Sequence, residues 1–160
     1  MKEKDSGKEK MGEKKIYITP IKEGTAIDHL APGAALKILE VLDLKEFPVT
    51  AAMNVGSRKM GKKDLIFIEG KKLSGKETEK IALIGKGGTL NIISNASIVK
   101  KVQLNYPEEV SGIIRCINPK CISNAEGIPA RFSVKSEPLK ATCFYCETRM
   151  NENEIINSIK

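Results

Sequence analysis

Four cysteines are the residues of this chain whose type and spacing point most clearly to chemistry. Cys116 and Cys121 are separated by four residues, Cys143 and Cys146 by two, and twenty-one residues lie between the two pairs. Two such pairs can place four thiolates around one tetrahedral ion at about 2.3 Å, and zinc is the usual occupant of an all-sulfur site. Because four protein ligands leave no open position for a substrate, the pattern predicts one structural zinc ion in the last third of the chain.

Other uses of these cysteines stay open at this point. They are two disulfides, a redox-active Cys143–Cys146 pair in a small enzyme, or an iron centre in place of zinc. The N-terminus is charged and has no secretory signal, which disfavours the oxidising compartment that disulfides need. A Cys-x-x-Cys pair alone is weak evidence for redox chemistry, and the presence of a second pair weakens it further.

Length and composition predict one or two small domains. The chain has 160 residues, of which 41% are hydrophobic and only 4% aromatic, so each core must be small. The longest apolar stretches have the length of a strand, well below the roughly twenty residues that cross a bilayer. We therefore expect a soluble, cytoplasmic protein with no membrane partner.

The net charge of +7 raises a polyanion as a possible partner, and its distribution along the chain decides where that partner would bind. Residues 15–107 hold fifteen basic and nine acidic residues, whereas residues 108–160 hold seven of each. Phosphate contacts supply most non-specific nucleic-acid affinity, so a neutral metal module argues against nucleic acid as a partner. A nucleic-acid-binding zinc-ribbon protein remains the alternative function, although the few aromatics offer little for base stacking. Any anion site is expected in the first domain.

The elements that must position these residues follow from periodicity and turn signals. Residues 1–14 form a charged tail that we expect to be disordered. Strands are expected at 16–21, 49–55, 64–69, 89–93 and 96–102, helices at 36–42 and 74–84, and a basic connection at 56–63.

The order strand, helix, two strands, helix, strand predicts an α+β protein. We expect a ferredoxin-like split βαβ domain at 15–104, with both helices on one face of an antiparallel sheet. A small β-rich, zinc-ribbon-like (rubredoxin-like) domain should follow at 105–160. Apolar residues on both sides of the first sheet favour self-association through it.

The one histidine follows an aspartate, in the segment Gly24–Leu30. A structural hydrogen bond at a turn explains an Asp28–His29 pair, and a catalytic role is disfavoured because no nucleophile with a matching base accompanies it. A binding role is also open. Asp28 can accept hydrogen bonds from ribose hydroxyls, His29 can donate to a phosphate, and lysines can neutralise a triphosphate. The lysines considered for this are Lys22, Lys63 and Lys101.

Several segments together resemble the regulatory chain of aspartate carbamoyltransferase. They are Gly24–His29, Met60–Ile66, Thr89–Asn95, Cys116–Glu126 and Cys143–Glu147, in the order of that family. The resemblance implies a non-catalytic subunit acting in pyrimidine biosynthesis, whose first domain binds CTP, ATP or UTP and forms a homodimer. It also implies a zinc domain that docks on the catalytic chain, in a dodecamer of six catalytic and six regulatory chains.

The resemblance also implies an effector site, residue by residue. Ile18, Pro20 and Ile21 would lie near the base, Asp28 at the ribose, His29 and Lys101 at the phosphates, with Lys22 and Lys63 adding charge and Asn91, Ile93, Ala96 and Ile98 lining the pocket.

Three positions depart from the family pattern. Ala96 replaces an aromatic residue, and Phe67 replaces a lysine that reaches the ribose and base, which puts the discrimination between CTP and ATP in question. Asn118 and Glu147 match positions near the catalytic-chain interface, where Lys120 replaces a neutral residue.

Overall fold

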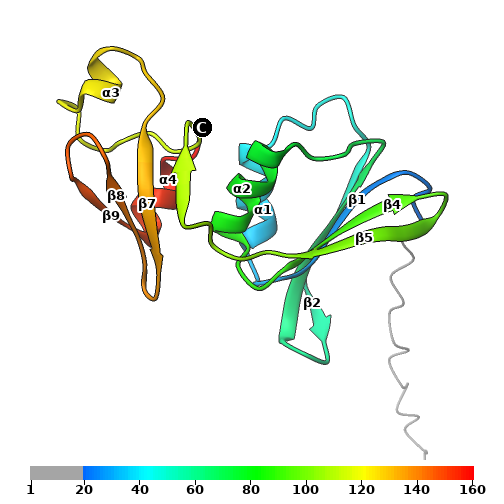
Figure 1. Cartoon of the computed structure of the whole chain (residues 1–160). Helices are drawn as coiled ribbons and strands as arrows, with labels where there is room; N and C mark the ends of the chain where they lie inside the picture. The colour runs from blue at the N-terminus through cyan, green and yellow to red at the C-terminus, as the bar shows by residue number, and fades with distance from the viewer. Residues whose placement is uncertain (1–19) are drawn as a thin grey trace, which may run out of the picture.

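The computed structural model describes residues 20–160, which form two antiparallel sheets of five and four strands (Figure 1). The expected tail at 1–14 lies outside the described residues, as does the expected strand up to residue 19. Within residues 20–160, every helix is too short or too polar to cross a membrane.

The larger sheet has the strand order β2-β3-β1-β4-β5, with every neighbouring pair antiparallel. Figure 1 shows α1 and α2 together on the face of this sheet that looks toward the smaller sheet. The first strand therefore lies between the third and the fourth, and the predicted ferredoxin-like split βαβ architecture is confirmed. The elements are β1 (Gly24–Leu30), α1 (Ala34–Val41), β2 (Val49–Ser57), β3 (Gly61–Glu69), α2 (Gly75–Ile84), β4 (Thr89–Ser94) and β5 (Ser97–Gln103).

The strand expected at 16–21 does not include Pro20 and Ile21, which have no regular structure. Sequence reasoning also missed β1, which covers Gly24–Leu30, the segment interpreted from sequence as containing a turn. Gly24 has φ 144°, and a Cβ there would lie 2.1 Å from the carbonyl oxygen of Ile68. A glycine at the start of a central strand is thus required by close backbone approach, yet in the sequence it reads as a loop signal.

The basic connection between β2 and β3 is also shorter than predicted. Both strands extend into the 56–63 segment, to Ser57 and from Gly61, and leave residues 58–60 as the turn. The second helix was predicted correctly, including its capping box. The Ser74 Oγ accepts a hydrogen bond from the backbone N–H of Glu77, and the Glu77 carboxylate accepts one from the backbone N–H of Ser74.

A fully buried carboxylate, Asp64 in β3, fixes the start of α1. Its Oδ2 accepts hydrogen bonds from the backbone N–H groups of Gly33 at 2.8 Å and Ala35 at 3.2 Å, and its Oδ1 accepts one from Asn54 at 2.7 Å. Asn54 has φ 55° and lies in a break of the β2–β3 register between Ala52 and Val55. Asp64 therefore satisfies helix N-terminal donors and a strand irregularity at once.

The smaller sheet has the order β6-β7-β8-β9 and contains the segment with the cysteines. Its elements are β6 (Glu109–Ser111), α3 (Ile122–Ala125), β7 (Arg131–Ser136), β8 (Leu139–Cys143), β9 (Arg149–Asn151) and α4 (Glu152–Asn157). The predicted small β-rich metal module is confirmed as a separate sheet with its own apolar core around Phe132.

The two parts of the chain share an apolar contact. Leu83 of α2 is 1% exposed and packs in the core of the smaller part, with Tyr106 packed against the same core. The Lys86 ammonium group lies 4.8 Å from the centre of the Tyr106 ring and 3.8 Å from the Glu137 carboxylate. Helix α2 therefore packs against both parts of the chain.

Candidate functional sites

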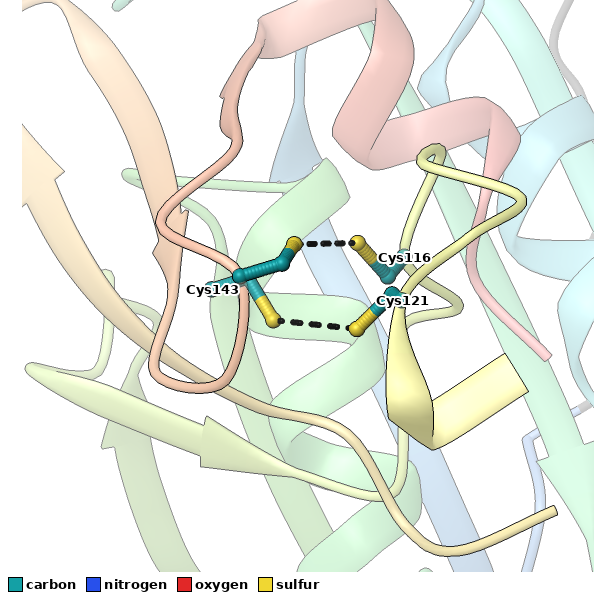
Figure 2. A group of neighbouring side chains, drawn as sticks. Cys116, Cys121 and Cys143 are labelled. Carbon is teal, nitrogen blue, oxygen red and sulfur yellow. Dashed lines mark hydrogen bonds between the residues drawn. The ribbon is translucent and has the colours of Figure 1, made fainter. Parts of the chain in front are cut away.

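The four cysteine sulfurs converge on one point. Cys116 and Cys146 have their sulfurs 3.6 Å apart, Cys121 and Cys143 have theirs 3.8 Å apart, and all four lie within 4.8 Å of one another. Figure 2 shows Cys116 and Cys121 facing Cys143 across the site. Sulfurs bonded at about 2.3 Å to one tetrahedral ion are about 3.8 Å apart, whereas a disulfide joins its sulfurs at about 2.05 Å. The donor set and its spacing fit a structural tetrahedral metal such as zinc.

Two short loops present these sulfurs. In the first, the Asn124 side-chain amide donates to the carbonyl oxygens of Cys116 and Asn118, both at 2.8 Å, and so ties α3 to the loop that carries Cys116. In the second, the backbone N–H of Cys143 donates to the carbonyl of Thr148 at 3.0 Å, and the chain reverses through Glu147 with φ 60°. Both loops are held by their own hydrogen bonds, so the ligands are positioned for one ion.

The electrostatics of the cluster call for a cation. Burial raises the pKa of the Cys116 thiol to about 12, and burial also raises the pKa of Cys143. Burial alone would raise the pKa of Cys146 too, but hydrogen bonds with Thr148 outweigh it and hold that pKa at about 6. Metal binding must therefore displace protons from the buried thiols, which makes the affinity rise with pH.

A second group, which includes the predicted site residues Asn91 and Lys101, lies on the face of the large sheet opposite the helices. Phe67, Ala26, Asn91 and Lys101 are direct partners in one row across β3, β1, β4 and β5. Their strand neighbours Ile66, Ile27, Leu90 and Val102 belong to the core beneath the helices. Because successive side chains of a strand alternate between faces, the four residues of the row share the helix-free face.

Asp28 and Lys63 add an ion pair to this face. Their side chains meet at 2.8 Å, and the backbone N–H of His29 donates to the Asp28 carboxylate. Burial alone would raise the pKa of Asp28, but the bonds with Lys63 and His29 outweigh it and hold the pKa below its usual value. Asp28 is thus ionised at neutral pH. His29 has φ 56°, in a break of the β1–β3 register, so the pair lies in a strand and the predicted turn is wrong.

Two buried polar atoms on these residues lack a partner. Among the described residues, the buried side-chain atoms without a hydrogen bond are Nδ1 of His29 and Oδ1 of Asn91. An unsatisfied buried polar group costs about 1–3 kcal/mol, and such groups call for an explanation such as a ligand. Both atoms belong to residues that the sequence predicted for one site.

The other predicted residues gather near the turn between β4 and β5. Ile93 pairs directly with Ile98, and the Ala96 backbone N–H donates to the carbonyl of Lys22 at 2.9 Å, which brings residues 20–22 beside the turn. Pro20 and Ile21 precede Lys22 directly, whereas Ile18 lies outside the described residues. Sequence reasoning missed the role of Glu23, whose carboxylate accepts hydrogen bonds from Ser94 and Asn95 and so holds this turn.

Replacing Ala96 with glycine is expected to stabilise the chain. Ala96 is exposed with φ 60°, a left-handed conformation that costs a non-glycine residue about 1 kcal/mol. Because glycine also loses more conformational entropy on folding, we expect the free energy of unfolding in urea to rise by only part of that amount, about 0.5 kcal/mol. The control is Ala51→Gly, in an exposed position of β2, which should lower it by about 0.5–1 kcal/mol. If both substitutions lowered stability alike, the left-handed strain at Ala96 would be refuted.

Comparison with known proteins decides the family. Residues 16–105 match the model of the aspartate carbamoyltransferase regulatory chain, allosteric domain, and residues 108–156 match the model of its metal binding domain. The chain belongs to the family of aspartate carbamoyltransferase regulatory chains. It is therefore a non-catalytic subunit, and its partner is a catalytic chain.

Relatives in this family match nearly end to end. The regulatory chain of Thermococcus onnurineus is 45% identical over 148 residues, covering 90% of this chain and 98% of that relative. That of Pyrococcus horikoshii is 44% identical over 149 residues, with the same coverage. That of Methanococcus aeolicus is 43% identical over 142 residues, covering 88% of this chain and 92% of that relative.

Proposed function

We propose that this chain binds nucleoside triphosphates, among them CTP, ATP and UTP, on the helix-free face of its large sheet and passes the effect to the catalytic trimers of aspartate carbamoyltransferase. The observation that carries the proposal is the row from Phe67 to Lys101 beside the Asp28–Lys63 pair, with unpartnered polar atoms on His29 and Asn91. A carboxylate, an imidazole and an amide beside free ammonium groups match the donors and acceptors of a ribose triphosphate.

Different residues of this face contact different parts of the nucleotide. The Asp28 carboxylate accepts hydrogen bonds from the ribose hydroxyls, and Lys63 keeps it ionised and oriented. His29 and Lys101 hold the phosphates, and Asn91 lines the pocket, where its unpartnered Oδ1 can accept a hydrogen bond from the nucleotide. Lys22 adds charge from the exposed side of the turn, and Pro20, Ile21, Ile93, Ala96 and Ile98 bound the pocket, with Ile18 contributing from the preceding segment.

The cysteine cluster serves a separate, structural purpose in this proposal. Zinc on Cys116, Cys121, Cys143 and Cys146 folds the surface that docks on the catalytic chain, since a module of this size rarely gains enough stability from its apolar core alone. Exposed apolar side chains surround the two cysteine loops: Ile117 is 40% exposed, Ile122 46%, Phe144 49% and Tyr145 45%. Such an apolar patch is typical of a protein interface. Asn118, Lys120 and Glu147 lie on the same loops and supply its polar contacts.

Transmission runs through the contact between the two parts. A nucleotide changes activity only through different affinities for two quaternary states, commonly worth about 1–3 kcal/mol of coupling. Leu83 packs in the core of the metal module while α2 covers the large sheet, so a shift of that sheet moves the docking surface. We propose that the chain divides into an effector domain at 15–104 and a metal domain at 105–160, which meet at this contact.

Assembly completes the proposal. Strand β2 is an edge of the large sheet, nine residues long and largely exposed, and an open edge of this length favours pairing with a second copy. Homodimers formed through the first domain would link two catalytic trimers into a cytoplasmic dodecamer of six catalytic and six regulatory chains.

The deciding experiment is aspartate saturation of the reconstituted enzyme, with and without this chain, at several concentrations of ATP, CTP and UTP. A nucleotide-dependent shift of the saturation curve that requires this chain supports the proposal. Assembly without any shift would leave only a scaffold and contradict effector binding.

Lys101→Ala is expected to weaken triphosphate binding about tenfold, since one charge-assisted hydrogen bond to phosphate is lost. The control is Lys100→Ala, which removes an equally exposed ammonium from the opposite face of the same strand. Calorimetry with ATP measures both affinities, and analytical ultracentrifugation checks that both variants still assemble. An equal loss in the two variants would assign the effect to general charge and reject the phosphate role of Lys101.

A further inference from the structure

We propose that Phe67 is the surface on which the base of the effector stacks, and that it makes this site prefer purine to pyrimidine triphosphates. The inference rests on the nucleotide-binding function proposed above and names the ligand class of that site.

The Phe67 ring is not part of either apolar core of the described residues. Phe67 is half-buried and belongs to neither of the two apolar clusters of the described residues, although it lies in the middle of β3. Phe47, the other aromatic residue between positions 20 and 105, packs against the core beneath the helices. Within the described part of the larger unit, Phe67 is thus the one aromatic ring on the helix-free face. A large apolar side chain in this position has a free surface to offer a ligand.

The second observation is what surrounds the ring. Its direct partners are Ala26 on β1 and Thr50 on β2, both small side chains. On the same face of β3, Leu65 precedes Phe67 by two residues and Lys63 precedes it by four. The Lys63 side chain pairs with Asp28. Asp28 itself lies two residues beyond Ala26 on the same face of β1, so the aromatic side chain and the carboxylate proposed for the ribose are near neighbours.

The third observation is the spacing along the row. Phe67 and Lys101 are three strands apart, on β3 and β5, with β1 and β4 between them. Neighbouring strands lie about 4.8 Å apart, so the two backbone positions are separated by about 14 Å. A nucleoside triphosphate extended across the sheet spans this separation, with its base over Phe67, its sugar near Asp28 and its phosphates near Lys101.

The preference for purines follows from the chemistry of the side chain. A phenyl ring has no polar hydrogen to donate to a pyrimidine carbonyl, so it recognises a base through stacking alone. Stacking grows with the area of overlap, and a purine presents two fused rings where a pyrimidine presents one. Loss of a stacking ring commonly weakens binding about tenfold or more. We expect ATP and GTP to bind several-fold more tightly than CTP and UTP.

The test is calorimetry on the full-length, metal-loaded chain with ATP, GTP, CTP, UTP and inorganic tripolyphosphate. Phe67→Leu keeps an apolar side chain and removes the ring, so it should weaken ATP and GTP about tenfold, weaken CTP less, and leave tripolyphosphate unchanged. Phe67→Lys should shift the ratio of ATP to CTP affinities toward CTP. The matched control is Phe47→Leu, the same substitution beneath the helices, which should leave that ratio unchanged.

The outcomes separate this inference from the function it rests on. Equal affinity of the unmodified chain for ATP and CTP, or an unchanged ratio in Phe67→Leu, would overturn the stacking role while triphosphate binding stands. If neither the nucleotides nor tripolyphosphate bound, the proposed effector site itself would fail, and the role of Phe67 would fail with it.

Discussion

Cys116→Ser is expected to abolish tight metal binding and, with it, attachment of this chain to the catalytic chain. Four thiolates within 4.8 Å of one another hold the ion, and a serine hydroxyl is a poor replacement for one of them. Binding of structural zinc by small domains is worth about 10–16 kcal/mol near neutral pH, and in such domains it supplies the free energy of folding. The metal module should therefore lose its fixed structure when a ligand is removed.

Three measurements check this expectation. Elemental analysis should fall from one metal ion per chain to a small fraction of that, circular dichroism should lose the smaller sheet, and size-exclusion chromatography with the catalytic chain should show no complex. The control is Ile113→Val, a fully buried residue of the same core, which costs about 1 kcal/mol without touching a ligand. A Cys116→Ser chain that kept its metal and docked normally would disprove the structural role of the ion.

The metal centre could be predicted from sequence because its ligands lie in two short local motifs. Spacing alone brings Cys116 near Cys121 and Cys143 near Cys146, so only the meeting of the two loops was left to the fold. The order of strands could be predicted for a similar reason. Helix connections of this length and one hairpin leave few ways to arrange four strands, and β1 between β3 and β4 is the usual one.

Strand β1 could not be predicted because it is central to the sheet. Thr25, Ala26 and Ile27 are all buried, so the alternation of polar and apolar residues that marks an exposed strand is missing. Gly24 at its start and Asp28–His29 near its end resemble turn signals, although the fold uses them for close approach and for a polar site. These residue types thus obscured the strand in the sequence.

The residues of the proposed effector face could be identified only from a family resemblance or from a structure. Phe67, Asn91 and Lys101 are far apart in sequence and come together only through the strand register, which no local pattern encodes. The resemblance supplied most of these residues, while the structure added the free side of the Phe67 ring and the Glu23 contacts that hold the β4–β5 turn. Self-association through the first domain stays a prediction.

Asp64→Asn is expected to destabilise the chain by about 3 kcal/mol, because hydrogen bonds to a charged group contribute about 1.5–3 kcal/mol each. The carboxylate accepts three backbone N–H groups, two on one oxygen and one on the other. An asparagine offers one oxygen and turns an NH₂ group toward the remaining donors. At least one backbone N–H, from Gly33 and Ala35 or from Asn54, then loses its acceptor.

Urea unfolding at neutral pH measures the loss, and the matched control is Asp43→Asn, the same change of side chain at an exposed position after α1. Asp43→Asn should change stability by less than about 0.5 kcal/mol, as is usual for surface positions. Because Asp64 joins the start of α1 to the irregular part of β2, amide hydrogen exchange in Asp64→Asn should accelerate at Gly33, Ala35 and Asn54 before it accelerates in the metal module. Equal losses in the two variants would mean that the buried carboxylate does not fix α1 to the sheet, and the helix would then be held by its apolar contacts alone.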